Sequence, residues 1–166
     1  RTKDALRLRG ASRSEANEPV PPAKSVAGDN PRAYCDEHLE LFFQAPGKSD
    51  YYHLCVGADG SRYDALCKDQ KAFTSDAWTS VVKTRKGLCE YTLTIPWSIF
   101  GADFKPAAGD VFKLSVVLRT KVPDPKHPGG TKPFSSGLPS VSFHDPAVGA
   151  DIVIDDNAGR RAGGAN

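Results

Sequence analysis

The residues best suited to chemistry lie in the segment Tyr34–Asp59, which reads YCDEHLELFFQAPGKSDYYHLCVGAD. In Glu37–Phe43 the side chains alternate, so one face carries Leu39, Leu41 and Phe43, and the other carries His38, Glu40 and Phe42. A carboxylate in mid-strand is costly to bury unless a partner compensates its charge. Glu40 is therefore either an ion-pair partner of Arg62 or Arg119, or a direct contact to a ligand.

Two consecutive strands are expected to position these groups. The first, Glu37–Phe43, is followed by Tyr51–Val56 after a loop that contains Pro46 and Gly47, which is typical of an antiparallel pair. His38 and His53 could then face each other across the pair. That arrangement is more typical of a satisfied polar pair than of a metal-ligand set.

Further short strands are predicted along most of the chain. The segments with strand-like composition or alternation are 5–9, 62–66, 77–83, 88–95, 110–119 and 150–154. Pro96 ends one of them, and the WSIFG that follows predicts a tight turn or a single helical turn. The Pro-rich stretches Ser12–Arg32 and Pro123–Pro139 predict long loops. Seven or eight strands without a helical period predict an all-β fold, an antiparallel β-sandwich.

Composition narrows the class of protein. A length of 166 residues suits one domain, and the hydrophobic fraction of 39% suits an ordinary core. No apolar run approaches the roughly 20 residues of a membrane helix, so no membrane insertion is predicted. With 22 basic and 20 acidic residues the net charge is only +2, which argues against nucleic-acid binding.

Metal and thiol chemistry receives little support. Cys35, Cys55, Cys67 and Cys89 lack the spacing of a zinc site; three disulfide pairings remain open, as do free buried thiols. No cofactor is predicted. Calcium is the alternative, because the stretches Asp145–Asp151 and Asp155–Asp156 supply hard oxygen ligands, although the sequence has no twelve-residue calcium loop.

Six segments together resemble carbohydrate-binding module family 9 and its DOMON-like sandwich relatives. They occur in the family's order: YCDEHLELFF, YYHLCVGADGSRYDA, AWTSVVK, CEYTLTIPWSIFG, PAAGDVFKLSVVLR and SFHDPAVGADIVI. The resemblance covers about residues 33–155 and implies a jelly-roll-like sandwich whose opening strands are missing before Arg1. Residues 1–32 are expected to add a strand and a Pro-rich loop to the same domain, and 156–166 a flexible tail.

The resemblance also implies a sugar site. In sugar-binding members two aromatic rings clamp a terminal sugar, and those positions fall on Tyr34 and Phe143, with the strand carboxylate at Glu40. A ring face covers the apolar side of a pyranose, and a carboxylate accepts its hydroxyl protons. His53 and Arg119 complete the predicted carbohydrate-binding set.

Two features depart from the family's pattern. The best sugar-binding members carry Trp at both ring positions, and a basic residue of the second strand is replaced here by Cys55. Trp78 and Trp97 are interpreted as core residues and not as stacking platforms.

The function predicted from this resemblance is a non-catalytic module that holds glycans near a polysaccharide-degrading partner, as one domain of a larger extracellular or periplasmic protein. The main alternative is a structural sandwich without a ligand. A glycoside hydrolase using Glu40 and Glu90 is a further alternative, but it needs two carboxyl groups roughly 5–9 Å apart. A haem-binding sandwich is disfavoured because the chain has no Met.

Overall fold

The computed structural model describes residues 4–13, 37–67, 76–123, 126, 131–138 and 149–154. Within these residues the chain forms nine strands and one short 3-10 helix. The elements are β1 (Ala5–Arg13), β2 (His38–Gln44), β3 (Tyr51–Gly57), β4 (Arg62–Leu66), β5 (Thr79–Arg85), β6 (Leu88–Pro96), η2 (Trp97–Phe100), β7 (Val111–Pro123), β8 (Thr131–Leu138) and β9 (Ala150–Val153).

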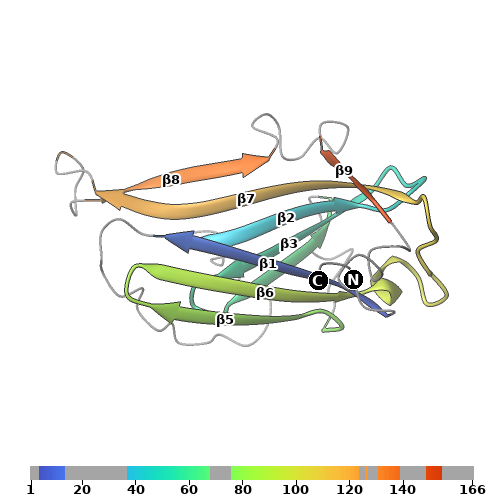
Figure 1. Ribbon diagram of the computed structural model, residues 1–166, viewed down its shortest axis with the longest axis horizontal. Helices are drawn as coiled ribbons and strands as arrows, with labels where there is room; N and C mark the ends of the chain where they lie inside the picture. The colour runs from blue at the N-terminus through green and yellow to red at the C-terminus, as the bar shows by residue number, and fades with distance from the viewer. Residues whose placement is uncertain are drawn as a thin grey trace, which may run out of the picture.

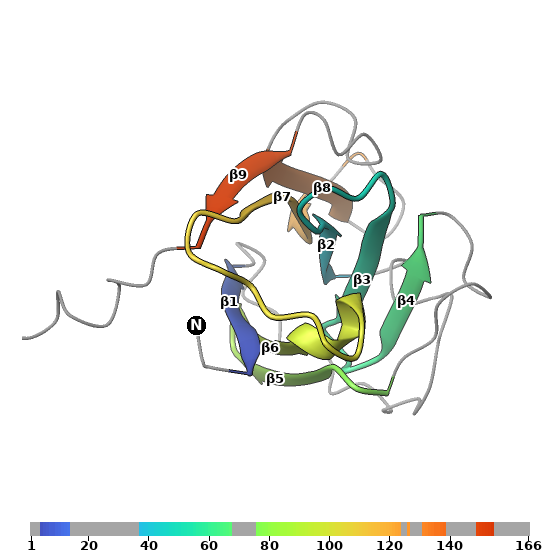
Figure 2. The same cartoon turned by 90° about the vertical axis from the view of Figure 1, so that its right-hand side faces the viewer.

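The strands form two antiparallel sheets that pack face to face (Figures 1 and 2). The smaller sheet has the order β1-β6-β5, and the larger has the order β4-β3-β2-β7-β8, with β9 also paired to β7. One edge of β7 pairs with β2, and β9 and β8 pair in succession along the other edge. The predicted antiparallel β-sandwich is therefore confirmed.

The core lies between the sheets because alternate residues of each strand point inward. On β6 these are Cys89, Tyr91, Leu93 and Ile95, all buried, whereas Glu90 between them is exposed. On β2 the inward residues are Leu39, Leu41 and Phe43, as the sequence pattern predicts. Burying each large apolar side chain contributes roughly 1.5–3 kcal/mol, so this alternation fixes which face of each strand turns inward.

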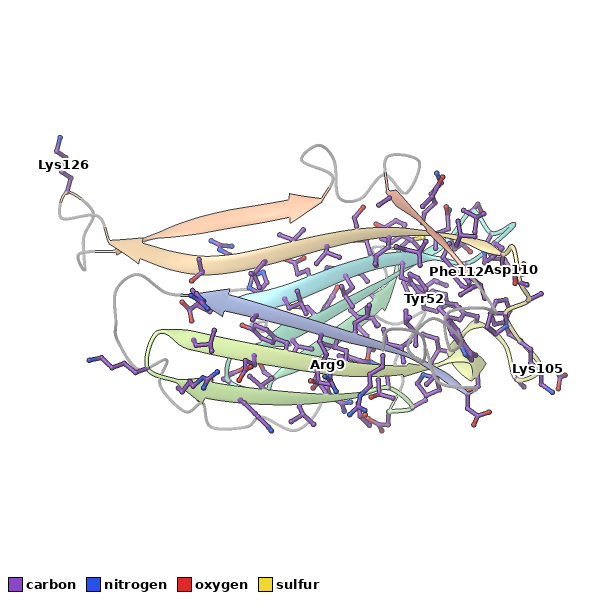
Figure 3. The ribbon with its side chains drawn as sticks, in the orientation of Figure 1. Arg9, Tyr52, Lys105, Asp110, Phe112 and Lys126 are labelled. Atoms are coloured by element: carbon purple, nitrogen blue, oxygen red, sulfur yellow. The ribbon has the colours of Figure 1, made fainter. Side chains whose placement is uncertain are left out.

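One end of the core is filled by aromatic rings. Phe43 of β2 and Phe112 of β7 stack with their centroids 5.0 Å apart and their planes 3° apart. Phe100 of η2 lies 5.2 Å from Phe43, and Trp97 lies 5.7 Å from Phe112. Figure 3 shows Phe112 at this end of the sandwich. The turn that follows Pro96 thus closes the core, and Trp97 is a core residue, as predicted.

Trp78 joins the two sheets at the side where β4 approaches β5. Its side chain is completely buried, and its Nε1–H donates to the Asp64 carboxylate at 2.6 Å. The guanidinium of Arg62 lies 5.0 Å from the centre of the Trp78 ring and donates to the Trp78 carbonyl at 2.6 Å. Trp78 is therefore a buried anchor, consistent with its interpretation as a core residue.

Two of the predicted loops need correction. The strand predicted at 5–9 continues to Arg13, so Ser12 and Arg13 belong to β1 and not to the long loop. The stretch Pro123–Pro139 contains β8, whose sequence TKPFSSGL shows no clear alternation. β8 pairs with the free edge of β7, which supplies backbone hydrogen bonds whatever the side-chain pattern, and an edge strand tolerates Pro133.

Candidate functional site

The candidate site lies on the outer face of the larger sheet, which is the face turned away from the core. Three neighbouring strands supply it, because residues directly opposite each other in an antiparallel pair point to the same side. Glu40 of β2 is opposite Cys55 of β3 and Val117 of β7. The alternate residues of each strand therefore share this face, which brings the predicted residues His53 and Arg119 onto it beside Glu40.

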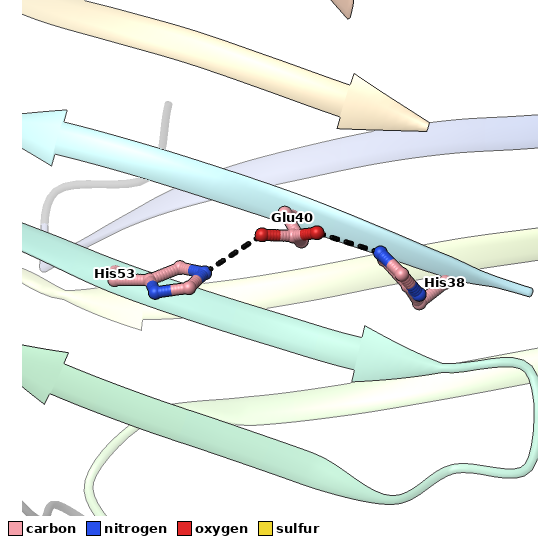
Figure 4. A network of polar contacts seen from close by, with 3 residues as sticks. All are labelled: His38, Glu40 and His53. Carbon is pink, nitrogen blue, oxygen red and sulfur yellow. Dashed lines mark hydrogen bonds and ion pairs between the residues drawn. The ribbon is translucent and has the colours of Figure 1, made fainter. Parts of the chain in front are cut away.

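Glu40 is the centre of a network with two histidines (Figure 4). The Nε2 atom of His38 lies 2.6 Å from Glu40 Oε1, and the Nε2 atom of His53 lies 2.9 Å from Glu40 Oε2. Each imidazole N–H donates to one carboxylate oxygen. His38 is two residues from Glu40 on β2, and His53 comes from β3, so the network connects adjacent strands.

Aromatic rings surround His53 and fix its plane. The ring of Phe42 stacks on the imidazole, with the centroids 4.3 Å apart and the planes 18° apart. The ring of Tyr63, from β4, meets the imidazole edge-on at 5.2 Å. His53 is 8% exposed and Phe42 is 4% exposed, so both side chains are buried although they lie on the outer face of the sheet. The position of the His53 imidazole is therefore set by packing as well as by its hydrogen bond.

Glu40 remains ionised in this setting. Burial raises the pKa of its carboxyl, but the hydrogen bonds and charges of His38 and His53 oppose this and lower the pKa from the ordinary value of 4.5 to about 2. The Glu40 side chain keeps 17% of its surface exposed. A carboxylate has about four lone-pair sites, of which the two imidazoles occupy two. The others remain available to a further donor.

The sequence predicted an arginine as the structural alternative partner of Glu40, and the structure corrects this. Arg62 points to the other face of its strand, where it pairs with Asp76 at 3.5 Å and packs on Trp78. Arg119 does lie on the outer face, opposite His38, and is half-buried. The two partners of Glu40 are instead histidines. His38 and His53 are not opposed in the strand register, since His38 faces Gly57 and His53 faces Phe42.

The two predicted ring positions, Tyr34 and Phe143, lie outside the described residues, as does Cys35. The histidine pair around Glu40 was the feature that sequence reasoning did not identify as a unit. The sequence did contain a signal for part of it, because His38 and Glu40 are two residues apart on one strand and therefore point to the same face. The cross-strand contact of His53 depends on the register, which the sequence alone does not fix.

Metal ligation receives no support from the described part of the chain, where no group of three or more His, Cys, Asp or Glu side chains is arranged to hold an ion. Of the acidic residues considered for calcium, Asp145, Asp155 and Asp156 lie outside that part, and Asp151 forms an ion pair with Lys113. Cys67 and Cys89 are free thiols. Each of the three disulfide pairings that the sequence leaves open would bond both of these residues, so none of the three is formed. Among the described residues, no helix has the length and hydropathy needed to cross a bilayer.

The carboxylate pair required by a hydrolase is not assembled from Glu40 and Glu90. Glu40 lies on the outer face of the larger sheet, whereas Glu90 of β6 is exposed on the outer face of the smaller sheet. The whole core separates the two. Hydrolysis needs both groups to flank one bond, so this pair cannot perform it.

Comparison with known proteins gives a likeness in structure and none in sequence. Neither protein-family models nor curated proteins match the chain. A carbohydrate-binding module of family 9 from Caldicellulosiruptor kristjanssonii, solved with cellotriose, matches with a TM-score of 0.56 at 14% identity, covering 94% of this chain and 73% of that one. One solved with glucose matches with a TM-score of 0.56 at 11% identity, covering 92% of this chain and 72% of that one. The chain thus has the fold of family 9 modules, and the predicted resemblance is confirmed at the level of fold.

Proposed function

We propose that this protein is a non-catalytic carbohydrate-binding module that holds glycans near a polysaccharide-degrading partner. The observation that carries the proposal is the convergence of Glu40, His53 and Arg119 on one outer sheet face of a sandwich whose structural neighbours are sugar-binding modules. The mechanism is effective concentration, because tethering an enzyme to its polymer raises the local substrate without new chemistry.

The geometry around Glu40 suits a polyhydroxylated ligand. The carboxylate is held ionised and oriented by two imidazoles, so it can accept hydroxyl protons without rearranging. Arg119 supplies donors from the neighbouring strand. We assign Tyr34 and Phe143 as the rings that cover the apolar faces of the sugar. Affinity should be weak, because sugar hydroxyls exchange hydrogen bonds with water at little net gain.

A structural sandwich without a ligand is the second candidate, and one observation favours it. Both oxygens of Glu40 already accept a hydrogen bond, and Phe42 beside it is nearly completely buried. On this account the network serves only to join β2 to β3. Direct measurement of sugar binding separates the two candidates.

The test is isothermal titration calorimetry with glucose, cellotriose and a panel of other oligosaccharides. The variants are Glu40→Gln, Tyr34→Ala and Phe143→Ala, with Glu90→Gln on the opposite face as the matched control. Loss of one ring should weaken binding by about fivefold or more, since stacking on an aromatic ring contributes on the order of 1–3 kcal/mol and about 1.4 kcal/mol is a factor of ten. Glu90→Gln should bind like the wild type. Absence of binding across the panel would favour the structural sandwich, and equal binding by all variants would refute the site.

A further inference from the structure

The outer face of the smaller sheet carries a concentration of positive charge that the net charge of +2 conceals. The outward side chains of β1 include Arg7, Arg9 and Arg13, and those of β5 include Lys83 and Arg85, all of them exposed. We call these five residues the basic face; Arg9 is labelled in Figure 3.

Little of this charge is neutralised within the protein. Arg85 pairs with Glu90 at 3.6 Å, and both side chains are well exposed, at 68% and 47%. The described residues place no carboxylate in ion-pair contact with Arg7, Arg9, Arg13 or Lys83. Glu90 is also the one acidic residue among the outward positions of the three strands. Most of the basic face is therefore available to an external anion.

The register arranges these cations in two parallel columns. β6 lies between β1 and β5, so the columns are separated by two strand spacings, or roughly 10 Å. Between the columns, β6 places Thr94 and Thr92, both half-buried, beside Arg7 and Arg9, and it places Glu90 beside Lys83. The threonine hydroxyls both donate and accept hydrogen bonds. Arg7 and Arg9 are two residues apart along β1, or about 7 Å. The result is an open band of staggered cations, with threonine hydroxyls beside Arg7 and Arg9 and one carboxylate, Glu90, beside Lys83.

We propose that the basic face binds an acidic polysaccharide that carries carboxylates or sulfates along its length. A guanidinium matches a carboxylate or sulfate with a two-pronged set of donors, and repeated anions can engage both cation columns together. The threonine column supplies partners for the sugar hydroxyls between the charged groups. An open sheet face suits an extended chain, whereas a pocket suits a chain end.

Other polyanions fit this face less well. Proteins that bind single-stranded nucleic acid stack its bases on aromatic side chains, and none of the outward residues of β1, β6 and β5 is aromatic. Membrane-surface binding combines cations with apolar side chains that enter the bilayer. Among the outward residues of these three strands, the one exposed large apolar side chain is Val81, which is 55% exposed.

This inference is independent of the site around Glu40, which lies on the opposite side of the sandwich. It concerns charged polymers, whereas the proposed site takes neutral sugar hydroxyls. A failure to bind neutral sugars would therefore not contradict the proposal for the basic face. Likewise, a failure to bind acidic polymers would not contradict the proposed site around Glu40.

The test is affinity electrophoresis of the full chain at low ionic strength, with polygalacturonate and heparin as acidic probes and hydroxyethyl cellulose as the neutral one. The variant Arg7→Gln/Arg9→Gln/Lys83→Gln is compared with Lys48→Gln/Lys105→Gln/Lys126→Gln, which loses the same charge from exposed lysines elsewhere. We expect the first variant to lose about tenfold in affinity for both acidic probes, because three exposed charge contacts are removed together. The control should change by less than about twofold, and added salt should weaken wild-type binding.

Three outcomes would overturn the proposal. They are equal losses in the two triple variants, absence of retardation by either acidic probe, and stronger binding to single-stranded DNA or phosphatidylserine vesicles than to polygalacturonate. Thermal unfolding of both variants serves as a control for folding. Because all six positions are exposed, their unfolding midpoints should match that of the wild type closely.

Discussion

The two outer faces of the sandwich differ in how their charged side chains are buried and paired. On the larger sheet Glu40 is mostly buried and both of its oxygens accept hydrogen bonds from histidines. On the smaller sheet, Arg7, Arg9, Arg13 and Lys83 are exposed and receive no carboxylate partner from the described residues. The strands on both sides alternate in the same manner, so the difference arises from what lies beside each outward residue.

The two faces therefore suit different kinds of recognition, one through fixed geometry and the other through long-range electrostatic attraction. A charge held by neighbours presents fixed geometry, which suits recognition of particular hydroxyl groups. Exposed, unpartnered cations attract anions over about a Debye length but fix little geometry. We therefore associate the face around Glu40 with selectivity, and the basic face with capture of charged polymers.

The largest expected effect is the loss of stability when the mostly buried carboxylate of Glu40 is replaced, compared with the exposed one of Glu90. Replacing Glu40 by Gln removes a charge that two imidazoles stabilise, and should lower the free energy of unfolding by about 2–3 kcal/mol. Replacing Glu90 by Gln removes a single exposed ion pair with Arg85 and should cost less than about 0.5 kcal/mol. Urea titration followed by the fluorescence of the buried Trp78 and Trp97 measures both. Equal costs would show that the two carboxylates are not distinguished by their surroundings.

The sequence predicted much of this contrast, because alternation identifies outward residues. It placed Glu40 and His38 together on one face of their strand and put Glu90 on a different strand. It could not say that His53 would reach Glu40, since that contact depends on the offset between β2 and β3. The cation columns of the basic face likewise depend on β1 pairing with β6, two elements far apart in the chain.

The error over β8 has the same origin. Its sequence lacks the alternation that marks strands, and its pairing is determined by the open edge of β7. Register and edge pairing are set by tertiary structure, so local patterns identify strands better than they identify neighbours. Arg62 illustrates this, because its partner Trp78 directly precedes β5 of the other sheet and could not be inferred from local spacing.

Lowering the pH should further distinguish Glu40 from Glu90 by its effect on folding stability. The pKa of Glu40 is depressed to about 2 in the folded protein, against an ordinary value of 4.5. A depressed carboxyl pKa contributes stability that is complete above about pH 4.5 and is lost as the pH falls towards 2. Wild type should therefore lose more stability over this interval than Glu40→Gln, whereas Glu90→Gln should follow the wild type. Urea titrations at several pH values in this interval measure the difference, and parallel curves for all three proteins would contradict the assignment.

The smallest expected effect concerns the basic face, where Arg7 and Arg9 lie two residues apart on the same side of β1 and have no carboxylate partner among the described residues. Replacing Arg9 by Gln should raise the free energy of unfolding by about 0.2–0.5 kcal/mol at low ionic strength, because repulsion from Arg7 is relieved. The gain should vanish in about 1 M salt, where the Debye length falls to about 3 Å. Lys105→Gln, an exposed position far from this cluster, is the matched control and should change stability less. A loss of stability in Arg9→Gln would mean that the arginine stem packs on the sheet more strongly than its charge repels. In that case the side chain would already have a role within the fold, and its availability to an acidic polymer would be correspondingly reduced.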